Sequence, residues 1–258
     1  MPVRLRVATF NIRNSRGADG WNSWWLRRRA CVAAIRQLGA DVLGLQEVRP
    51  PQVRYLRRSL PEYAFAGRGR DADGGGEHAL LLVGGGWTVE SAETRWLSPD
   101  PDVPGSVGWD AGLTRVATLA RLRRGGSVLG VANTHFDSSG AQARDNSAAL
   151  LAGWLAAEPD RPWLVLGDLN ARPGSPPLRR LAAAGFADPL PAGAGGTEHA
   201  FTGATDRDRI DYVLAGPGVR VLDVRVDHFR PGGRLPSDHW PVVADVEIPD
   251  PPAPSPSP

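Results

Sequence analysis

The chain has 258 residues, and its 41% hydrophobic and 22% charged content is ordinary for a globular protein. All 30 basic residues are arginine and 28 residues are acidic, so the formal net charge of +2 permits a phosphate-bearing partner without demanding nucleic acid. No apolar run is long enough to cross a bilayer, and a single cysteine, Cys31, excludes an internal disulfide framework and a cysteine-based metal cluster.

The length is compatible with one domain or two, and we predict a single domain over residues 1–248, followed by a disordered Pro/Ser-rich tail at 249–258. The first residues, MPVRLRVATFNIR, alternate like a strand and lack the apolar stretch of a secretory signal. We therefore expect a cytoplasmic monomer without a membrane partner.

Short segments rich in Val, Leu or Ile and bounded by Gly, Pro or Asp predict strands, and apolar residues at three- and four-residue spacing predict helices. This mixture predicts an α/β protein built on sheets, with Cys31 packed in its core. The expected strands are 3–10, 41–48, 79–83, 114–122, 127–134, 163–168, 209–215, 219–228 and 241–247, and the expected helices are 24–38, 141–157 and 177–184.

Polar side chains recur at the carboxyl ends of the expected strands. Any one of them is more simply explained by a turn, because Asn and Asp bond readily to nearby backbone groups. Their repetition nevertheless suggests that they converge on one site. The residues are Asn11, Glu47, Asn133 with His135 and Asp137, Asp168 with Asn170, and Asp211.

Two of these positions have a chemistry suited to phosphate esters. In GDLN, Asp168 and Asn170 leave the same face if the strand pleat persists, so a carboxylate that can deprotonate water lies beside an amide that can bind a phosphate oxygen. Glu47 ends the segment DVLGLQEV, and an isolated carboxylate there suits Mg²⁺, which accepts few protein ligands. In SDHWP, the adjacent Asp238 and His239 are a weak signal on their own.

Taken together, seven short motifs resemble the endonuclease/exonuclease/phosphatase superfamily over essentially residues 5–247. Each motif is weak alone, but the ordered series is far harder to obtain by chance. The resemblance implies a four-layered α/β sandwich, in which two packed, mostly antiparallel sheets are flanked by helices and the site lies at one edge. The motifs are TFNIR (9–13), LQEV (45–48), GEHALLLV (76–83), NTHFD (133–137), GDLN (167–170), RIDYVL (209–214) and SDHWP (237–241).

The resemblance also implies a metal centre and a water-activating group. Glu47 would be the principal ligand of Mg²⁺, with Mn²⁺ as the alternative ion, and it would be supported by Asn11 and Asp238. Asp168 would position or activate the attacking water, and Asn170 would hold a phosphate oxygen.

Two histidines are implied as well, each with an acidic partner. His239 would contact the scissile phosphate, with its imidazole oriented by Asp211. His135 would be the second histidine, with Glu77 as its carboxylate partner. Both pairs would keep the imidazoles oriented and more readily protonated beside a dianionic transition state.

Further residues are expected to contact the substrate. Arg115 in WDAGLTRV could bind phosphate through two N–H groups, or it could form a structural ion pair. His199 in GTEHAFTG resembles a substrate contact of the small bacterial members, although Glu198 departs from the aromatic residue usual there. Asn133 completes the expected set.

The run WNSWWLRRR at 21–29 has two interpretations. Its tryptophans and arginines could form a stacking and phosphate patch for nucleic acid. We favour the alternative, in which the run starts an amphipathic helix whose tryptophans pack and whose arginines are solvated.

The sequence therefore predicts a metal-dependent phosphoester hydrolase in which water attacks phosphorus in line. The modest net charge favours a small or moderately sized ester, such as a sugar phosphate, a nucleotide or a lipid head group. The alternatives are a nuclease that cleaves DNA or RNA and, less favoured, a catalytically silent binding module.

Overall fold

The computed structural model describes residues 2–249, so the expected tail lies outside the described residues except for its first position. The strands are β1 (Val3–Asn11), β2 (Val42–Val48), β3 (Ala64–Ala66), β4 (His78–Val83), β5 (Thr88–Trp96), β6 (Val116–Arg124), β7 (Ser127–His135), β8 (Trp163–Asp168), β9 (Asp211–Ala215), β10 (Arg220–Val226) and β11 (Val242–Ile248). The helices are α1 (Trp24–Leu38), α2 (Pro50–Ser59), α3 (Ala141–Ala156) and α4 (Pro176–Ala183), with 3-10 turns at Gly20–Asn22 and Pro231–Gly233.

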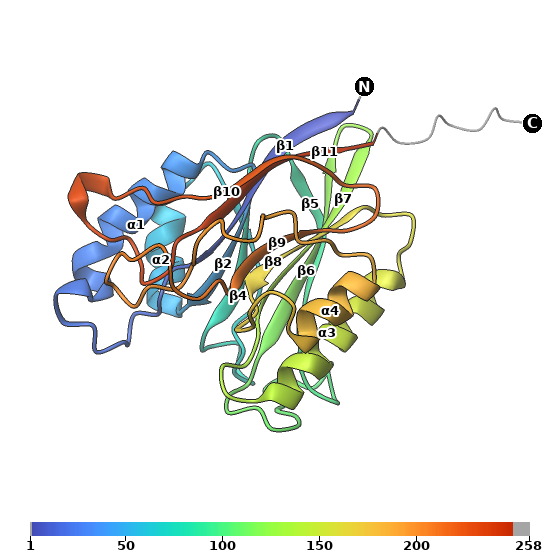
Figure 1. The fold of residues 1–258 in the computed structure, drawn as a ribbon, viewed down its shortest axis with the longest axis horizontal. Helices are drawn as coiled ribbons and strands as arrows, with labels where there is room; N and C mark the ends of the chain where they lie inside the picture. Colours follow the sequence, from blue (N-terminus) through green and yellow to red (C-terminus); the bar gives the residue numbers. More distant parts are fainter. Residues whose placement is uncertain (1, 250–258) are drawn as a thin grey trace, which may run out of the picture.

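The strands form two sheets, a six-stranded sheet of order β10-β11-β1-β2-β4-β3 and a five-stranded sheet of order β5-β6-β7-β8-β9. Each sheet contains one parallel pair, β1 with β2 and β7 with β8, and its other neighbours are antiparallel. Helices α1 and α2 lie on one side of the paired sheets, and α3 and α4 lie on the other (Figure 1). The expected four-layered α/β sandwich is confirmed.

Three apolar clusters hold the layers together. Val7 and Val131 belong to the cluster between the two sheets, Ile35 to the cluster under α1 and α2, and Leu151 to the cluster under α3 and α4. Cys31 is fully buried in the second cluster, as expected, and burial raises the pKa of its thiol to about 12. The expected core cysteine is therefore confirmed.

Helix α1 follows from its sequence. Its apolar residues Trp24, Cys31, Ile35 and Leu38 recur at helical spacing and are buried, and Gly39 ends the helix in the left-handed conformation at φ 58°. Among the helices of residues 2–249, none combines the length and apolar character that a bilayer span requires.

One helix and two strands of the structure were not predicted from the sequence. Helix α2 starts with Pro50 and Pro51, which suggest a loop, but proline is well suited to the first helical positions because its N–H would be unpaired there. Strand β5, with the sequence TVESAETRW, is mostly exposed and therefore lacks apolar alternation, and β3 has only three residues.

The sheet registers bring the carboxyl ends of several strands to one edge. The parallel pairs place Asn11 opposite Gln46 and His135 opposite Asp168. The antiparallel pair β8 and β9 places Asp168 opposite Asp211. Because parallel strands share their carboxyl edge, polar side chains far apart in the sequence meet there.

Candidate active site

Asn11, at the end of β1, links the two sheets at this edge. Its Nδ2 donates hydrogen bonds to Glu47 Oε1 at 3.1 Å and to Asp168 Oδ2 at 2.9 Å. Its Oδ1 accepts the backbone N–H of Arg13 at 2.9 Å. Its nitrogen thus faces the carboxylates and its oxygen is turned toward the backbone, and the expected role of Asn11 as a metal ligand stays a prediction.

Glu47, near the end of β2, is held in a strained conformation. Its φ is 60°, a left-handed value that is unusual for a side-chain-bearing residue, and the ladder between β2 and β4 shifts register between Leu45 and Val48. Asn14 donates to Glu47 Oε2 from its backbone N at 2.9 Å and from Nδ2 at 2.7 Å. Such strain fixes the direction of one carboxylate at the site.

The charge of Glu47 is favoured by its neighbours. Burial opposes ionisation, but His135 and the hydrogen bonds from Asn14 and Asn11 outweigh it and lower the pKa of Glu47 to about 2. Glu47 is therefore a partly buried anion that is available to a cation.

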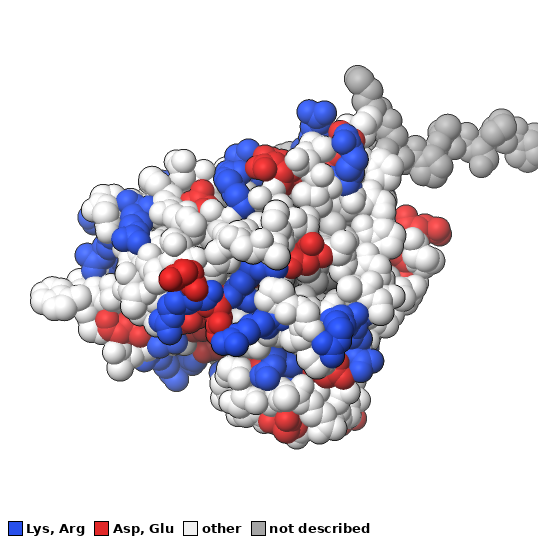
Figure 2. Space-filling model, viewed as in Figure 1, with Lys and Arg blue, Asp and Glu red and all other residues white. Residues whose placement is uncertain are grey.

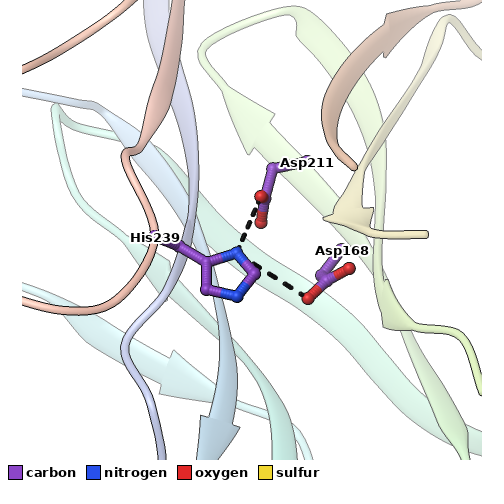
Figure 3. A group of neighbouring side chains, drawn as sticks. All are labelled: Asp168, Asp211 and His239. Atoms are coloured by element: carbon purple, nitrogen blue, oxygen red, sulfur yellow. Dashed lines mark hydrogen bonds and ion pairs between the residues drawn. The ribbon is translucent and has the colours of Figure 1, made fainter. Parts of the chain in front are cut away.

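Asp168, Asp211 and His239 form the compact group shown in Figure 3. His239 Nδ1 lies 2.9 Å from Asp211 Oδ2 and 3.9 Å from Asp168 Oδ2. All three side chains are buried, and each offers an atom within 4.8 Å of the others. The group comes from the end of β8, the start of β9 and the loop before β11.

The electrostatic surroundings favour different protonation states for Asp168 and His239. Burial and the nearby Asp211 raise the pKa of Asp168 to about 7. Burial disfavours the imidazolium of His239, but Asp211 and Asp168 overcome this effect and raise the pKa of His239 well above 6.5. The structure thus contains a carboxyl group that is poised near neutral pH beside a protonated imidazole.

His135 and Asn170 complete the edge. Asn170 Nδ2 donates to His135 Nε2 at 3.0 Å and to Phe136 O at 3.0 Å, and Asn170 has a positive φ of 46°. His135 Nε2 also lies 3.5 Å from Asp168 Oδ2. Burial, followed by the charge of Arg115, lowers the pKa of His135 well below 6.5 in the protein without substrate, while the charge of Glu47 acts in the opposite direction, and the expected protonation of this imidazole stays a prediction.

Glu77 contacts arginines and not His135. Its carboxylate lies 2.6 Å from Arg70 Nη1 and 3.8 Å from Arg49 Nη1. A tight turn between residues 69 and 78 places Arg70 beside Glu77, since Arg70 N donates to Glu77 O at 3.0 Å. The expected pairing of Glu77 with His135 is therefore wrong.

Comparison with known proteins identifies the family. Residues 8–239 match the sequence profile described as the Endonuclease/Exonuclease/phosphatase family. The chain belongs to this family. Comparison with curated protein sequences gives no significant match.

Solved structures of the endonuclease/exonuclease/phosphatase family support the assignment. A family member from Bacteroides vulgatus is 33% identical, with a TM-score of 0.88 over 95% of this chain and 99% of that one. A mannosyl-6-phosphatase from Bacteroides thetaiotaomicron is 27% identical, with a TM-score of 0.86 over 94% of this chain and 99% of that one. D. rerio TDP2 complexed with single strand DNA product, at 18% identity, shares the fold with a TM-score of 0.74 over 94% and 98% of the two chains.

Of the expected substrate contacts in this family member, Arg115 is well placed. Its side chain is 6% exposed, and its Nε lies 3.6 Å from Asp137 Oδ2. It also lines a small cavity together with Glu47 and His135. Arg115 therefore forms an ion pair and faces the site, so both interpretations of this residue stay open.

Two other expected substrate contacts are corrected. Asn133 is fully buried between the sheets, where it accepts a hydrogen bond from Gln46 Nε2 at 2.7 Å and donates to the carbonyls of Leu45 and Leu80. His199 is also fully buried, stacks on Trp240 at 4.3 Å and accepts the N–H of Gly203 at Nδ1. Neither side chain is accessible to a substrate in this structure.

Asp238 lies near the site but is partly engaged. Its Oδ2 is 3.6 Å from Arg13 Nε, and its Oδ1 lies 3.2 Å from Ser237 Oγ. Sequence reasoning missed Asn14 and Arg70, which contact Glu47 and Glu77. Both lie in loops, where the sequence has no periodic pattern from which their contacts could be predicted.

Proposed function

We propose that this protein hydrolyses phosphate esters of small polar molecules, such as sugar phosphates, in a reaction that requires a divalent cation, Mg²⁺ or Mn²⁺. The observation that carries the proposal is the convergence of Glu47, Asp168 and the His239–Asp211 pair on one buried edge. The family consists of hydrolytic phosphoesterases, and the arrangement supplies a cation ligand, a base and a charged hydrogen-bond donor.

The side chains at this edge fit a divalent cation. Partly buried Glu47 and buried Asp168 are carboxylates that share one amide group, and buried Asp211 Oδ1 has no hydrogen-bond partner among residues 2–249. Oxygen donors of this kind match the preference of Mg²⁺. We assign Glu47 as the principal ligand, Asp238 as a further candidate and Asn11 as the group that positions the carboxylates.

An alternative cation site consists of Asp168, Asp211 and His239, which are close enough to share an ion. We prefer a hydrogen-bonded network for these three residues. His239 Nδ1 already donates to Asp211, and a raised pKa favours the protonated imidazole, which cannot bind a metal through either nitrogen.

The chain's own groups then account for removal of a proton from the attacking water and for stabilisation of the developing charge. Asp168, with its pKa near neutral, accepts a proton from the attacking water. Protonated His239, oriented by Asp211, donates a hydrogen bond to a phosphate oxygen as negative charge develops. A bound cation supplies further stabilisation of charge on the phosphate and leaving-group oxygens. Entry of a dianionic phosphoryl group beside neutral His135 would raise the pKa of that imidazole.

Polar side chains beside Glu47 and His135 support a compact polar substrate. Arg70, Glu77 and Arg115 line a small cavity together with these two residues. Two guanidinium groups suit a dianionic phosphoryl group, and the Arg70–Glu77 pair offers donors and an acceptor to sugar hydroxyls. Similarity to a mannosyl-6-phosphatase supports the same substrate class.

The test is phosphate release from mannose 6-phosphate, glucose 6-phosphate, bis(p-nitrophenyl) phosphate and oligonucleotides, with Mg²⁺ and with chelator. We expect turnover of sugar phosphates that needs the cation and is lost in Glu47→Gln, whose Mg²⁺ binding is measured by calorimetry. The matched control is Glu62→Gln, which changes an exposed glutamate outside the site. Full activity of Glu47→Gln would refute the assignment.

A nuclease is the second candidate, because helices α1 and α2 are rich in arginine. Helix α1 carries four arginines, α2 carries three, and neither contains an acidic residue. Arg29, Arg36 and Arg58 line a hollow of about 700 Å³ between these helices. Figure 2 shows arginines over the side occupied by α1. Cleavage of a single-stranded oligonucleotide that weakens in Arg29→Ala/Arg58→Ala would favour this candidate.

A further inference from the structure

Arg27 differs from the neighbouring arginines of α1 because its side chain is fully buried. Within residues 2–249 it forms no ion pair with a carboxylate, and burial holds its pKa below the ordinary arginine value. The expectation that the arginines of WNSWWLRRR are solvated is therefore wrong for Arg27. A buried cation that contacts no carboxylate is costly, so its hydrogen bonds must offset the loss of water.

The guanidinium group of Arg27 donates four hydrogen bonds, all to backbone carbonyls. Nε donates to Asn22 O at 2.9 Å, Nη1 donates to Ile12 O and Pro236 O at 2.8 Å, and Nη2 donates to Arg13 O at 2.8 Å. These acceptors belong to three segments, of which the one at Pro236 is distant in the sequence from those at Ile12–Arg13 and Asn22. One side chain therefore ties them together.

Two of these segments carry residues of the candidate active site. Ile12 and Arg13 directly follow Asn11, whose amide holds Glu47 and Asp168. Pro236 stands three residues before His239. Ser237 Oγ adds a hydrogen bond to Asn11 O at 2.7 Å, so the same two segments are joined a second time.

The geometry requires arginine at this position. A guanidinium group offers five donors in one rigid plane, whereas the three donors of lysine radiate from a single atom. The group is also packed between two aromatic rings, with its Cζ 5.4 Å from the ring centroid of Trp24 and 5.5 Å from that of Phe201. Phe201, from the loop before β9, has a positive φ of 60°. Four pieces of chain thus meet at one planar group.

We propose that Arg27 is a positioning residue that keeps the Asn11 segment in register with the His239 segment, so that the carboxylates and the imidazole face the same phosphate. This inference rests on the proposed phosphoesterase function. Arg27 does not itself reach the substrate, because its side chain is fully buried.

The experiment compares Arg27→Lys and Arg27→Met with Leu38→Ala. Leu38 is buried at the other end of α1, so its truncation destabilises the same helix without touching the site. For a sugar phosphate with Mg²⁺, we expect kcat to fall about 100-fold in both Arg27 variants, with KM changed less than about threefold, since misplacement by about 1 Å has such an effect. Millimolar guanidinium should restore part of kcat in Arg27→Ala.

Thermal unfolding shows whether each protein is folded at the assay temperature. Equal loss of kcat in Leu38→Ala and Arg27→Lys, at equal loss of thermal stability, would overturn the inference, as would unchanged kcat in Arg27→Lys. A second readout does not need activity. The imidazole NMR resonances of His239, assigned with His239→Asn, should shift in Arg27→Lys and stay in place in Leu38→Ala. If the wild-type protein proves inactive but the His239 resonances still shift in Arg27→Lys, only the proposed function is refuted.

Discussion

Replacing Asp211 by asparagine tests the charge relation at the centre of the site. The substitution keeps the size of the side chain but removes its charge. In the structure, Asp211 Oδ2 accepts from His239 Nδ1 at 2.9 Å, and both residues are buried. Asparagine can still accept a hydrogen bond, so the change isolates the effect of the negative charge.

The expected loss follows from the strength of a charge-assisted hydrogen bond. Such a bond contributes about 2–3 kcal/mol, so loss of the charge should lower kcat/KM by about 30- to 160-fold at neutral pH. The pH profile should also move. Asp211 raises the pKa values of both His239 and Asp168, and without its charge both values fall, so both limbs of the profile should shift to lower pH.

The assay is kcat/KM for a phosphate ester across the pH range at saturating Mg²⁺. The control is Asp245→Asn, which removes an ion-paired aspartate that contacts Arg6 at 2.7 Å, away from the site. Asp211→Asn activity above about one third of wild type, or a profile that stays in place, would refute the assigned charge relation, because a bond of this strength predicts a larger effect.

Three further predictions address other groups. Folding raises the pKa of Asp168 from 3.8 to about 7. The free energy of unfolding of the protein therefore falls as the pH rises from about 4 to about 7, because ionisation of this carboxyl is less favourable in the folded state. In urea unfolding at pH 8 with a chelator present, Asp168→Asn should therefore be more stable than wild type by about 4 kcal/mol. No such gain is expected at pH 4, and Mg²⁺ should reduce the difference in stability at pH 8. Equal stability at both pH values would contradict this reasoning. Asn133→Ala should cost about 2–4 kcal/mol of unfolding free energy because its partners Gln46, Leu45 and Leu80 are left unpaired, while KM changes less than about twofold. A large rise in KM would restore Asn133 as a substrate contact. Glu77→Gln should lower kcat/KM about tenfold for mannose 6-phosphate and leave p-nitrophenyl phosphate unaffected, because only the sugar offers hydroxyls. Equal losses for both substrates would contradict a contact between Glu77 and the sugar hydroxyls.

The main strands and the polar residues at their ends could be predicted from the sequence. Strands β1, β2, β7 and β8 have apolar runs that end in polar residues, and their chain positions place those ends together once the parallel pairs form. The elements missed were those whose stability does not depend on apolar periodicity, such as α2 with its two prolines and the exposed strand β5.

Contacts between distant side chains were less predictable. Glu77 was expected beside His135, but the turn at 69–78 gives it Arg70 as a closer partner. Asn133 and His199 carry polar groups that suit a substrate, yet the packing of the two sheets and of Trp240 encloses them. Burial is a property of the assembled layers, and it cannot be read from residue type.

The sequence by itself determined the layered α/β fold, the family and the set of side chains that end the strands, because apolar periodicity and the ordered motifs are properties of the chain. Only the tertiary structure decided how these side chains are paired and charged. A pKa near 7 for Asp168 requires burial beside Asp211, and the alignment of the Asn11 and His239 segments requires Arg27 between them. Both effects depend on distances between residues far apart in the sequence, which folding alone sets.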